Sequence, residues 1–361
     1  MKINLIGTYP PPYGGISIHI KRLREKFKKN NDVKIIALNK VFEEGIESCS
    51  LKKLLVKLIF INSKEIIHSN LTGRNGKLFL GYYCFLFNKK IIITVHGAGL
   101  TESYQNSNFL IKKIYKFSLK NLTHIIVVNR DIKEECLSLG ITEEKISVIS
   151  PYLNPVINEE DYKKIDKSVW DFIEKNRKNG SKIITGNGNI RFFNNEDLYG
   201  LDMLIELIYL LKQRNYKVSL VFALLGYKDQ TNEERRYFED LENRIKRYKI
   251  EEDIFIYKVK DTEYYPILEK SDIFIRPTNT DGDAISIREA IYLKKPNISS
   301  DIVKRPEESM LFKTRNINDL VNKTEYIIKN YQNEVKKLKK IKVKEYYEEV
   351  LEVYKKVYEG I

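Results

Sequence analysis

Short apolar runs alternate along the chain with longer segments in which apolar residues recur every three or four positions. The short runs predict buried strands, and the longer segments predict helices. The predicted strands are residues 2–8, 33–38, 65–69, 90–97, 124–128, 145–150, 182–187, 217–224, 253–258, 272–277 and 296–300. The clearest helical patterns are residues 15–29, 108–121, 200–214, 231–249 and 284–294. Strands that alternate with helices indicate parallel βαβ units, so we expect an α/β protein with two tandem doubly wound, Rossmann-like parallel-sheet domains.

Residues 151–180 interrupt this alternation with prolines, many charges and no predicted strand. We place the connection between the domains in this segment, which gives a first domain of residues 1–165 and a second of residues 166–335. The lysine-rich segment of residues 330–361 is predicted to be helical. Its last part, residues 336–361, lies outside both domains, and one arrangement for it is a helix that packs against the first domain. Its lysine-rich face indicates either a solvated surface or contact with anionic lipid headgroups.

Composition narrows the classes of partner. A chain of 361 residues with 42% hydrophobic content can build two cores. A net charge of +14 and a pI near 9.3 favour a partner that carries phosphate: a nucleotide, a nucleic acid or an anionic membrane surface. No helix-turn-helix signature, RNP motif or zinc module stands out, which argues against nucleic acid. Three widely spaced cysteines and four histidines argue against a disulfide framework or a metal site.

Location is predicted from the cysteines and the apolar runs. The scarcity of cysteine fits a reducing cytoplasm. The chain opens with a predicted strand and turn and not with an export signal. The longest apolar stretch, residues 78–87, has about half the residues that a membrane span needs, and we expect a buried helix there. These features predict a cytoplasmic protein, with a peripheral position at the inner face of the cytoplasmic membrane as the alternative.

Candidate binding residues lie at the ends of predicted strands. In two doubly wound domains, ligands bind beyond the carboxyl ends of the strands, which we expect to lie in the cleft between the domains. Gly14 and Gly15 follow the first strand and precede a helix, which suits the approach of an anion to backbone N–H groups. His96 ends the fourth strand, and Arg191 lies in a Gly- and Asn-rich loop, residues 185–202, that suits a diphosphate. A tight turn, a structural histidine and a surface loop are the alternatives, and the other three histidines are predicted to be structural.

Two acidic residues, Asp281 and Glu289, flank the start of a predicted helix in "TNTDGDAISIREAIYLKKP" (residues 278–296). Carboxylates accept hydrogen bonds from vicinal hydroxyls, so the pair suits a sugar near one acid and a ribose near the other. A phosphate would meet the free backbone N–H groups at the helix N-terminus, those of Gly282, Asp283, Ala284 and Ile285. A solvated helix face is the alternative, but the position after a late strand favours a binding site.

Several segments together resemble one known family. "PPPYGGISIHIKRL", "TVHG", "HIIVVNRDIKEECLSLGITEEKISVISPYLN" and "RPTNTDGDAISIREAIYLKKPNISSD" look like family-4 retaining glycosyltransferases of the GT-B fold, in the right order over nearly the whole chain. The resemblance implies that the first domain faces the acceptor and that the second binds the nucleotide sugar. It implies that Gly15 approaches the donor phosphates, His96 contacts the transferred sugar, Asp281 holds sugar hydroxyls and Glu289 holds the ribose.

The resemblance also implies an activity. It implies a metal-independent, retaining glycosyltransferase without a cofactor, which moves a hexose-type sugar from a nucleotide diphosphate donor such as a UDP- or GDP-sugar. The acceptor would be a glycan or a polyprenyl-linked saccharide in surface polysaccharide synthesis.

Two positions depart from the family pattern. Asp281 stands where the family has Glu, and Tyr199 stands where a diphosphate-binding Lys is expected. Arg191 matches the family Arg, and Arg288 and Arg276 are candidates for the missing cation. A non-catalytic nucleotide-sugar-binding protein with a degenerate phosphate site is therefore an alternative, as is another enzyme on this fold, such as a sugar-nucleotide epimerase.

Overall fold

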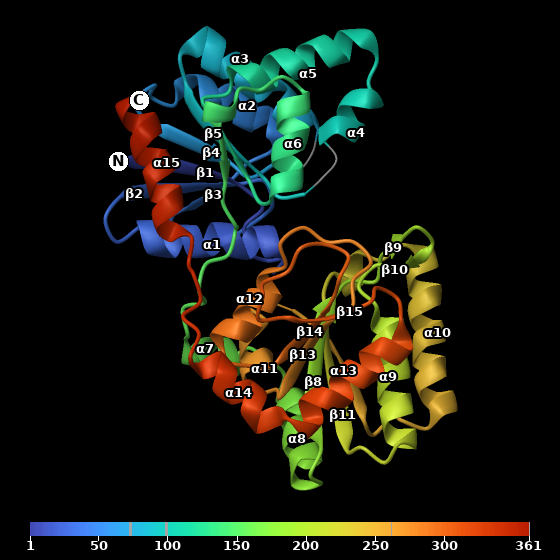
Figure 1. The fold of residues 1–361 in the computed structure, drawn as a ribbon. Coiled ribbons are helices and arrows are strands. Elements are labelled where there is room, and N and C mark those ends of the chain that lie inside the picture. Colours follow the sequence, from blue (N-terminus) through green and yellow to red (C-terminus); the bar gives the residue numbers. More distant parts are fainter. Residues whose placement is uncertain (72–73, 98–99, 261, 361) are drawn as a thin grey trace. The chain divides into compact units, whose positions relative to one another are not determined.

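Two parallel sheets organise the chain, as predicted (Figure 1). The computed structural model describes residues 1–71, 74–97, 100–260 and 262–360. It divides into a first unit, Met1–Leu153 with Glu345–Ile361, and a second unit, Asn154–Lys344. The chain thus passes from one unit to the other near residues 153 and 344, whereas the sequence placed the boundaries at residues 165 and 335.

The first unit contains a seven-stranded sheet in the order β3-β2-β1-β4-β5-β6-β7, with every pair parallel. Its strands are β1 (Lys2–Gly7), β2 (Asp32–Ala37), β3 (Ile46–Ser48), β4 (Ile66–Ser69), β5 (Lys90–Val95), β6 (His124–Val127) and β7 (Ile146–Val148). Its helices are α1 (Gly15–Phe27), α2 (Leu51–Phe60), α3 (Arg74–Phe87), α4 (Leu100–Gln105), α5 (Phe109–Asn121), α6 (Arg130–Ser138) and α15 (Tyr347–Glu359), with a 3₁₀ turn η1 (Glu143–Lys145).

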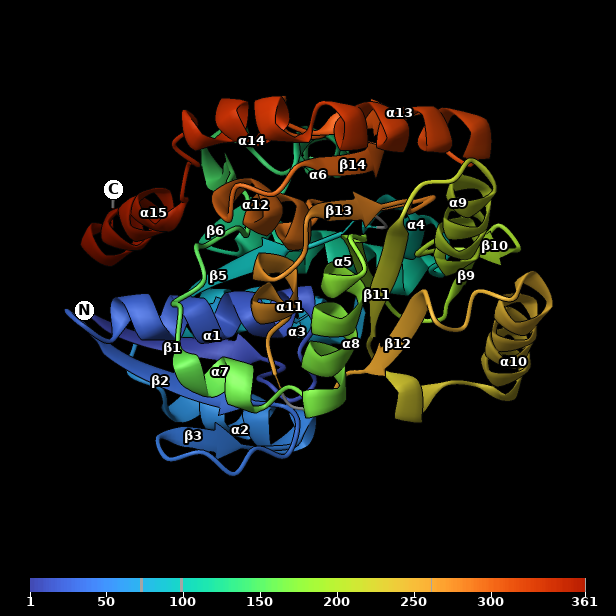
Figure 2. The same cartoon turned by 90° about the horizontal axis from the view of Figure 1, so that it is seen from below.

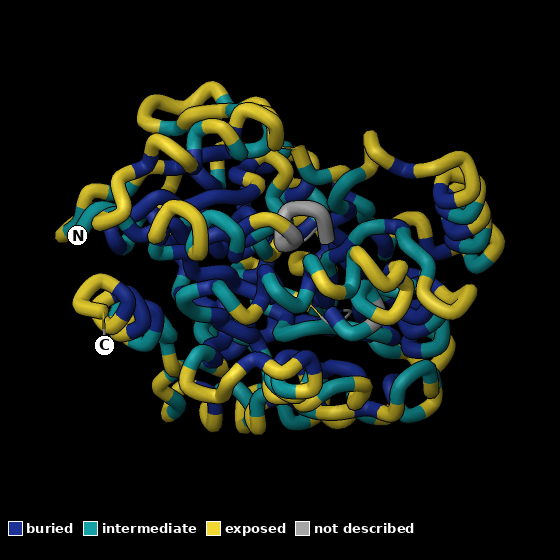
Figure 3. The backbone as a smooth tube through the Cα atoms, turned by 90° about the horizontal axis from the view of Figure 1, so that it is seen from above, coloured by how far each residue is buried: buried dark blue, intermediate teal, exposed yellow. Residues whose placement is uncertain are grey.

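Both faces of the first sheet are covered, because successive side chains on a strand point to opposite faces. On β5, Ile91 and Ile93 pack in the core under α2, α3 and α5, while Ile92 packs in the core under α1 and α15. The central strands are buried, and the outer sides of the helices are exposed (Figure 3). Burial on both faces explains why these strands read as continuous apolar runs in the sequence.

The C-terminal helix α15 completes one of these cores. Tyr354 is fully buried, and its hydroxyl lies 2.6 Å from Nδ1 of His68, whose Nε2 lies 2.7 Å from the hydroxyl oxygen of Thr94. Burial lowers the pKa of His68 to about 3, so the ring is neutral. His68 is a satisfied core residue, in keeping with the structural role predicted for it.

The second unit contains a six-stranded parallel sheet in the order β12-β11-β8-β13-β14-β15 and a separate antiparallel hairpin, β9-β10. Its strands are β8 (Lys182–Gly188), β9 (Phe192–Phe193), β10 (Glu196–Asp197), β11 (Val218–Leu224), β12 (Ile254–Lys258), β13 (Ile273–Arg276), β14 (Asn297–Ser300) and β15 (Met310–Phe312). Its helices are α7 (Glu159–Lys163), α8 (Lys167–Lys178), α9 (Leu201–Gln213), α10 (Asn232–Tyr248), α11 (Tyr265–Glu269), α12 (Ile285–Tyr292), α13 (Ile317–Lys329) and α14 (Tyr331–Lys339), with a 3₁₀ turn η2 (Tyr227–Asp229). The helices α9, α10 and α13 cover one face of this sheet, and α8, α11 and α12 cover the other (Figure 2).

Two expectations about helices are corrected. The segment 330–361 is not one helix: α14 ends at Lys339 in the second unit, and α15 begins at Tyr347 in the first. The helix predicted at residues 78–87 forms as the end of α3, but it is not buried, because Phe85 and Leu86 are both 63% exposed. Within the described residues, α3 and the other helices are all too short or too polar to cross a membrane.

Each sheet has one point where the strand order reverses. In the first unit this point lies between β1 and β4, and in the second it lies between β8 and β13. Loops that follow the two central strands diverge there and leave a crevice at the carboxyl edge, where open α/β sheets bind ligands. The two switch points therefore define where candidate sites belong in each unit.

Candidate functional site

The switch point of the second unit brings together the loops that follow β8 and β13. A Cβ on Gly200 would lie 2.5 Å from the carbonyl oxygen of Pro277, and Gly200 has φ +71°, so only glycine fits at this position. A Cβ on Gly188 would overlap the ring of Tyr199. The glycines of the loop therefore allow Tyr199 to lie over the end of β8.

Arg276 lies at the centre of this arrangement. It is the last residue of β13, and its Nε and Nη2 donate to the two carboxylate oxygens of Asp281 at 3.1 and 3.3 Å. Its Nη1 donates to the carbonyl oxygen of Asn187 at 3.2 Å, and its guanidinium lies 5.2 Å from the ring centroid of Tyr199. Tyr199, which stands where the resemblance led us to expect a Lys, thus contacts a cation that comes from the neighbouring strand.

A second arginine, Arg305, reaches Asp281 from the segment after β14. Its Nη1 donates to Asp281 Oδ2 at 3.0 Å, and its Nη2 donates to Thr278 Oγ1 at 3.1 Å. Its Nε donates to the carbonyl oxygen of Ser300 at 3.2 Å. The side chain of Arg305 is only 2% exposed. Arg305 was not among the residues predicted from the sequence.

The carboxylate of Asp281 is fully engaged by the protein. Besides the two arginines it accepts hydrogen bonds from Thr278 Oγ1 at 3.2 Å and from the backbone N–H of Gly282 at 3.1 Å. Burial alone would raise the pKa of Asp281, but the charges of Arg276 and Arg305 outweigh burial and hold the pKa at about 2. Asp281 is therefore ionised at neutral pH, and the donors around it occupy the roughly four positions at which a carboxylate accepts hydrogen bonds.

Helix α12 begins directly after this cluster. Its N-cap residue, Ala284, provides no side-chain hydrogen bond to the first turn. The flanking Asp283 is held by Nε of Arg288 at 3.0 and 3.1 Å. The backbone at Gly282, Asp283, Ala284 and Ile285 is thus at the N-terminus of an eight-residue helix, beside two arginines, where an anion is stabilised.

Glu289 lies on the buried side of the same helix and is 4% exposed. Burial of the Tyr264 hydroxyl raises the pKa of Tyr264 well above its usual range, and the negative charge of Glu289 raises it further. The hydroxyl of Tyr264 in turn lies 2.9 Å from Thr185 Oγ1 on β8. Glu289 thus belongs to the same switch-point region as Asp281, two helical turns away.

Arg191 is placed differently. Its Nη1 forms an ion pair with Glu234, the buried residue of the capping box that begins α10. The hairpin β9-β10 separates it from Tyr199 along the chain, and Asp197 on that hairpin accepts hydrogen bonds from the backbone N–H groups of Tyr199 and Gly200. In this structure, therefore, Asp281 is held by Arg276 and Arg305, whereas Arg191 holds Glu234.

In the first unit, the loop after β1 leads into α1 through Gly14 and Gly15. The backbone N–H of Gly14 donates to Ser17 Oγ at 2.9 Å, which closes the first turn of the helix. A Cβ added at Gly14 would meet no atom within 4 Å, and its φ of −104° suits any residue. The chain's own packing therefore gives no reason for glycine at this position.

His96 follows β5 and is partly exposed. Its Nε2 donates to Oδ1 of Asn70, the residue after β4, at 2.8 Å, in the tautomer that carries the hydrogen on Nε2. Asn70 is 2% exposed, and among the described residues its Nδ2 has no hydrogen-bond partner. His19, whose ring lies 5.4 Å from that of His96, bonds to the carbonyl oxygen of Pro151 and is buried, which lowers its pKa to about 4. At the switch point of this unit, the side chain of His96 is therefore held by the side-chain amide of Asn70.

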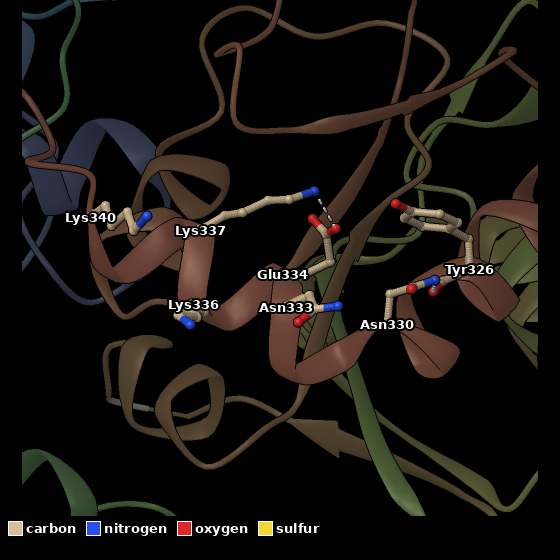
Figure 4. Close-up of a pocket in the computed structure, with 7 residues that line it drawn as sticks. All are labelled: Tyr326, Asn330, Asn333, Glu334, Lys336, Lys337 and Lys340. Carbon is tan, nitrogen blue, oxygen red and sulfur yellow. Dashed lines mark hydrogen bonds and ion pairs between the residues drawn. The ribbon is translucent and has the colours of Figure 1, made fainter.

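A separate surface pocket of about 280 Å³ lies on α13 and α14 (Figure 4). Within it, Lys337 Nζ forms an ion pair with Glu334 at 2.7 Å. It is lined by Tyr326, Asn330, Asn333, Glu334, Lys336, Lys337 and Lys340. None of these is a candidate site residue. Over the described part of the chain, no group of three or more His, Cys, Asp or Glu side chains is arranged to hold a metal ion.

Two family models match the chain. Residues 175–345 match the family Glycosyl transferases group 1, and residues 13–155 match Glycosyltransferase Family 4. A search of curated proteins finds no match.

Solved structures show the same fold at low identity. Anabaena HepE in complex with UDP-glucose is 12% identical, with a TM-score of 0.67, over 93% of this chain and 92% of HepE. A glycosyltransferase from Rickettsia africae is 17% identical, with a TM-score of 0.73, over 99% and 98%. Sucrose-phosphate synthase from Thermosynechococcus elongatus is 15% identical, with a TM-score of 0.68, over the full length of both chains. With the two family matches side by side along its length, the chain belongs to the group 1 and family 4 glycosyltransferases of the GT-B fold, which transfer a sugar from a nucleotide-sugar donor.

Proposed function

We propose that the protein is a retaining glycosyltransferase that moves a hexose-type sugar from a UDP- or GDP-sugar to a glycan or polyprenyl-linked acceptor, in surface polysaccharide synthesis. The observation that carries this proposal is the pair of buried arginines, Arg276 and Arg305, beside the N-terminus of α12, with Glu289 buried on the same helix. The UDP-glucose bound to HepE makes UDP-sugars the first donors to test.

The donor diphosphate would bind at the start of α12. Its negative charge increases as the bond to the sugar breaks, and preorganised guanidinium and N–H groups stabilise such charge without reorganisation. Arg276, supported by Tyr199, takes the place of the family Lys in this proposal. Arg191 could bind the diphosphate only if its ion pair with Glu234 broke, so we assign it a secondary role in binding the donor.

Asp281 and Glu289 would act differently. Because the oxygens of Asp281 already accept hydrogen bonds from two arginines, its first role would be to position these cations. A direct contact with sugar hydroxyls requires one of the present donors to move away. Glu289 would accept hydrogen bonds from the ribose hydroxyls of the donor.

The reaction would be a substitution at the anomeric carbon. The acceptor oxygen forms the new bond on the face from which the diphosphate leaves, the bond between the anomeric carbon and the diphosphate oxygen breaks, and the acceptor proton passes to that oxygen. His96 would contact the transferred sugar and be oriented by Asn70, whose buried Nδ2 has no hydrogen-bond partner among the described residues, which supports a polar ligand nearby. Gly14 and Gly15 would let the donor approach the backbone of the first unit.

The test is a panel of UDP-, GDP-, ADP- and dTDP-sugars, with thermal stabilisation and nucleoside diphosphate release as readouts. We expect one donor to stabilise the protein and to release its diphosphate. Glu289→Ala should lose most of both, whereas Glu289→Gln, which keeps the shape and part of the acceptor capacity, should retain more binding.

Two results would count against the proposal. Stabilisation by a nucleotide sugar without diphosphate release, with any acceptor saccharide, would favour the non-catalytic binding protein. If no nucleotide sugar stabilises the protein, the donor site itself is wrongly assigned.

A further inference from the structure

The outer side of three helices in the first unit carries an unusual set of exposed apolar side chains. Half of the large apolar side chains that are exposed in the described residues lie on α2, α3 and α5. We call this set the α2–α3–α5 face. Its members are Leu51, Val56, Ile59, Phe60, Phe79, Phe85, Leu86, Phe87, Phe109 and Leu110. Single exposed apolar residues are ordinary, but a concentration on adjacent elements marks a site of interaction.

The three helices lie side by side on one face of the first sheet (Figure 1). The hydroxyl of Tyr83 on α3 donates to the carbonyl oxygen of Leu55 on α2 at 2.9 Å. On the other side of α3, the ring of Phe117 on α5 lies 4.8 Å from that of Tyr82 and 5.4 Å from that of Phe85. α3 thus packs between α2 and α5, so the three helices form one continuous layer that carries these exposed residues.

The charged residues of these three helices have one sign, although Lys57 on α2 forms an ion pair with Glu47 of β3. The sequences of α2, α3 and α5 contain no Asp or Glu. The lysines of α2 and α5 are Lys52, Lys53, Lys57, Lys112, Lys113, Lys116 and Lys120. Lys113 Nζ lies 4.4 Å from the ring centroid of the exposed Phe109, so cations and aromatic rings are interleaved. Aromatic and aliphatic residues among lysines are typical of surfaces that lie in the interface of an anionic bilayer.

We propose that the α2–α3–α5 face binds to the surface of an anionic lipid bilayer, with its Phe and Leu side chains in the headgroup region and its lysines against lipid phosphates. A second copy of the chain fits less well, because an isologous contact would bring lysines against lysines. The helices would lie on the membrane, since none of the described helices can cross it.

This surface is distinct from the C-terminal segment in which lipid contact was first expected. Helix α15 carries more acidic than basic residues, with Glu348, Glu349, Glu352 and Glu359 against Lys355 and Lys356. Its apolar side is also occupied, because Val350, Val353, Tyr354 and Val357 pack in the core of the first unit.

The experiment is sedimentation of the full-length protein with phosphatidylcholine vesicles that contain either no phosphatidylglycerol or about 30 mol % of it. Wild-type protein should sediment with the anionic vesicles, and binding should fall as salt is raised. The double variant F85S/L86S should bind about tenfold more weakly, because two side chains would no longer insert. K52E/K53E should also bind at least about tenfold more weakly, since each nearby Lys contributes about fivefold.

Matched controls separate lipid binding from folding. I302S/L311S removes two exposed apolar side chains, 42% and 43% exposed against 63% for Phe85 and Leu86, from the second unit, and K355E/K356E makes the same charge change on α15. Both controls should bind vesicles as the wild type does. The altered residues are exposed and lie outside the donor site, so K52E/K53E and both controls should keep the wild-type melting temperature. F85S/L86S loses the ring contact between Phe85 and Phe117 and should melt slightly lower while staying folded at the assay temperature. Equal vesicle binding by F85S/L86S and wild type, no binding by wild type, or a dimer that F85S/L86S dissociates would each overturn the proposal.

Discussion

At the scale of single residues, the network around Asp281 has a direct energetic consequence. Two guanidinium groups are buried against one carboxylate, and the side chains of Arg276 and Asp281 are each 11% exposed. Removing one partner of a buried ion pair is costly because the other charge stays buried without its counter-charge. The network therefore links the stability of the second unit to the protonation state of Asp281.

We expect Asp281→Asn to destabilise the second unit at neutral pH. The difference between the pKa of about 2 and the ordinary value of 3.8 corresponds to roughly 2 kcal/mol of stability. Because the pKa is lowered in the folded state, this stability is present above pH 4 and is lost as the pH falls towards 2. Urea unfolding across this range should show a steeper loss for the wild type than for Asp281→Asn.

Asp283→Asn is the control, because Asp283 pairs with one arginine whose side chain is 20% exposed. It should cost less than Asp281→Asn at pH 7. Equal stability of wild type and Asp281→Asn at pH 7 would show that the two arginines do not depend on this carboxylate.

The residues of this network were predictable only in part. Asp281 and Glu289 were identified because they flank the start of a helix after a strand, and Arg276 was a candidate cation because it ends that strand. Arg305 gave no such signal: it lies 24 residues from Asp281 and approaches it through the loop after β14. Periodicity reports on contacts within one element, whereas this contact depends on which strands are neighbours in the sheet.

At the scale of elements, the apolar runs predicted the central strands well, because strands buried on both faces are continuously apolar. The strands that were missed are short or at sheet edges: β3, β15 and the hairpin β9-β10. In such strands few residues are buried, so the sequence keeps the polar character of a loop. The split of the C-terminal segment was missed for a different reason. Residues 340–346 carry lysines like the helices on either side and contain no Gly or Pro to mark a break, and α15 then packs in the core of the first unit.

The attachment of α15 yields a prediction for Tyr354. Its ring lies 5.0 Å from that of Phe27, and its hydroxyl bonds to the neutral, buried His68. Tyr354→Phe keeps the packing but leaves His68 Nδ1 without a partner, which should cost about 1–3 kcal/mol. Tyr358→Phe is the control, since Tyr358 is on the same helix and 45% exposed, and it should cost less than about 0.5 kcal/mol. Urea unfolding followed by far-UV circular dichroism measures both, and equal effects would contradict this role for Tyr354.

At the scale of the whole molecule, the chain forms two units, each with its own sheet and cores. Units of this kind often unfold as separate cooperative transitions. The chain has a single tryptophan, Trp170, which lies on α8 in the second unit. Tryptophan fluorescence therefore reports on the second unit, while far-UV circular dichroism reports on both.

This difference makes the assignment of the donor nucleotide testable in the intact protein. If the nucleoside diphosphate binds mainly to the second unit, a concentration of 100 times its Kd stabilises that unit by about 2.7 kcal/mol. The urea transition of Trp170 fluorescence should then move to higher urea, while the remaining transition in circular dichroism should stay in place. Asp281→Asn should reduce the shift, because it releases the arginines proposed to hold the diphosphate. A nucleotide that moves only the other transition would place its binding residues in the first unit, around Gly14 and His96, and would refute the role proposed for Arg276 and Arg305.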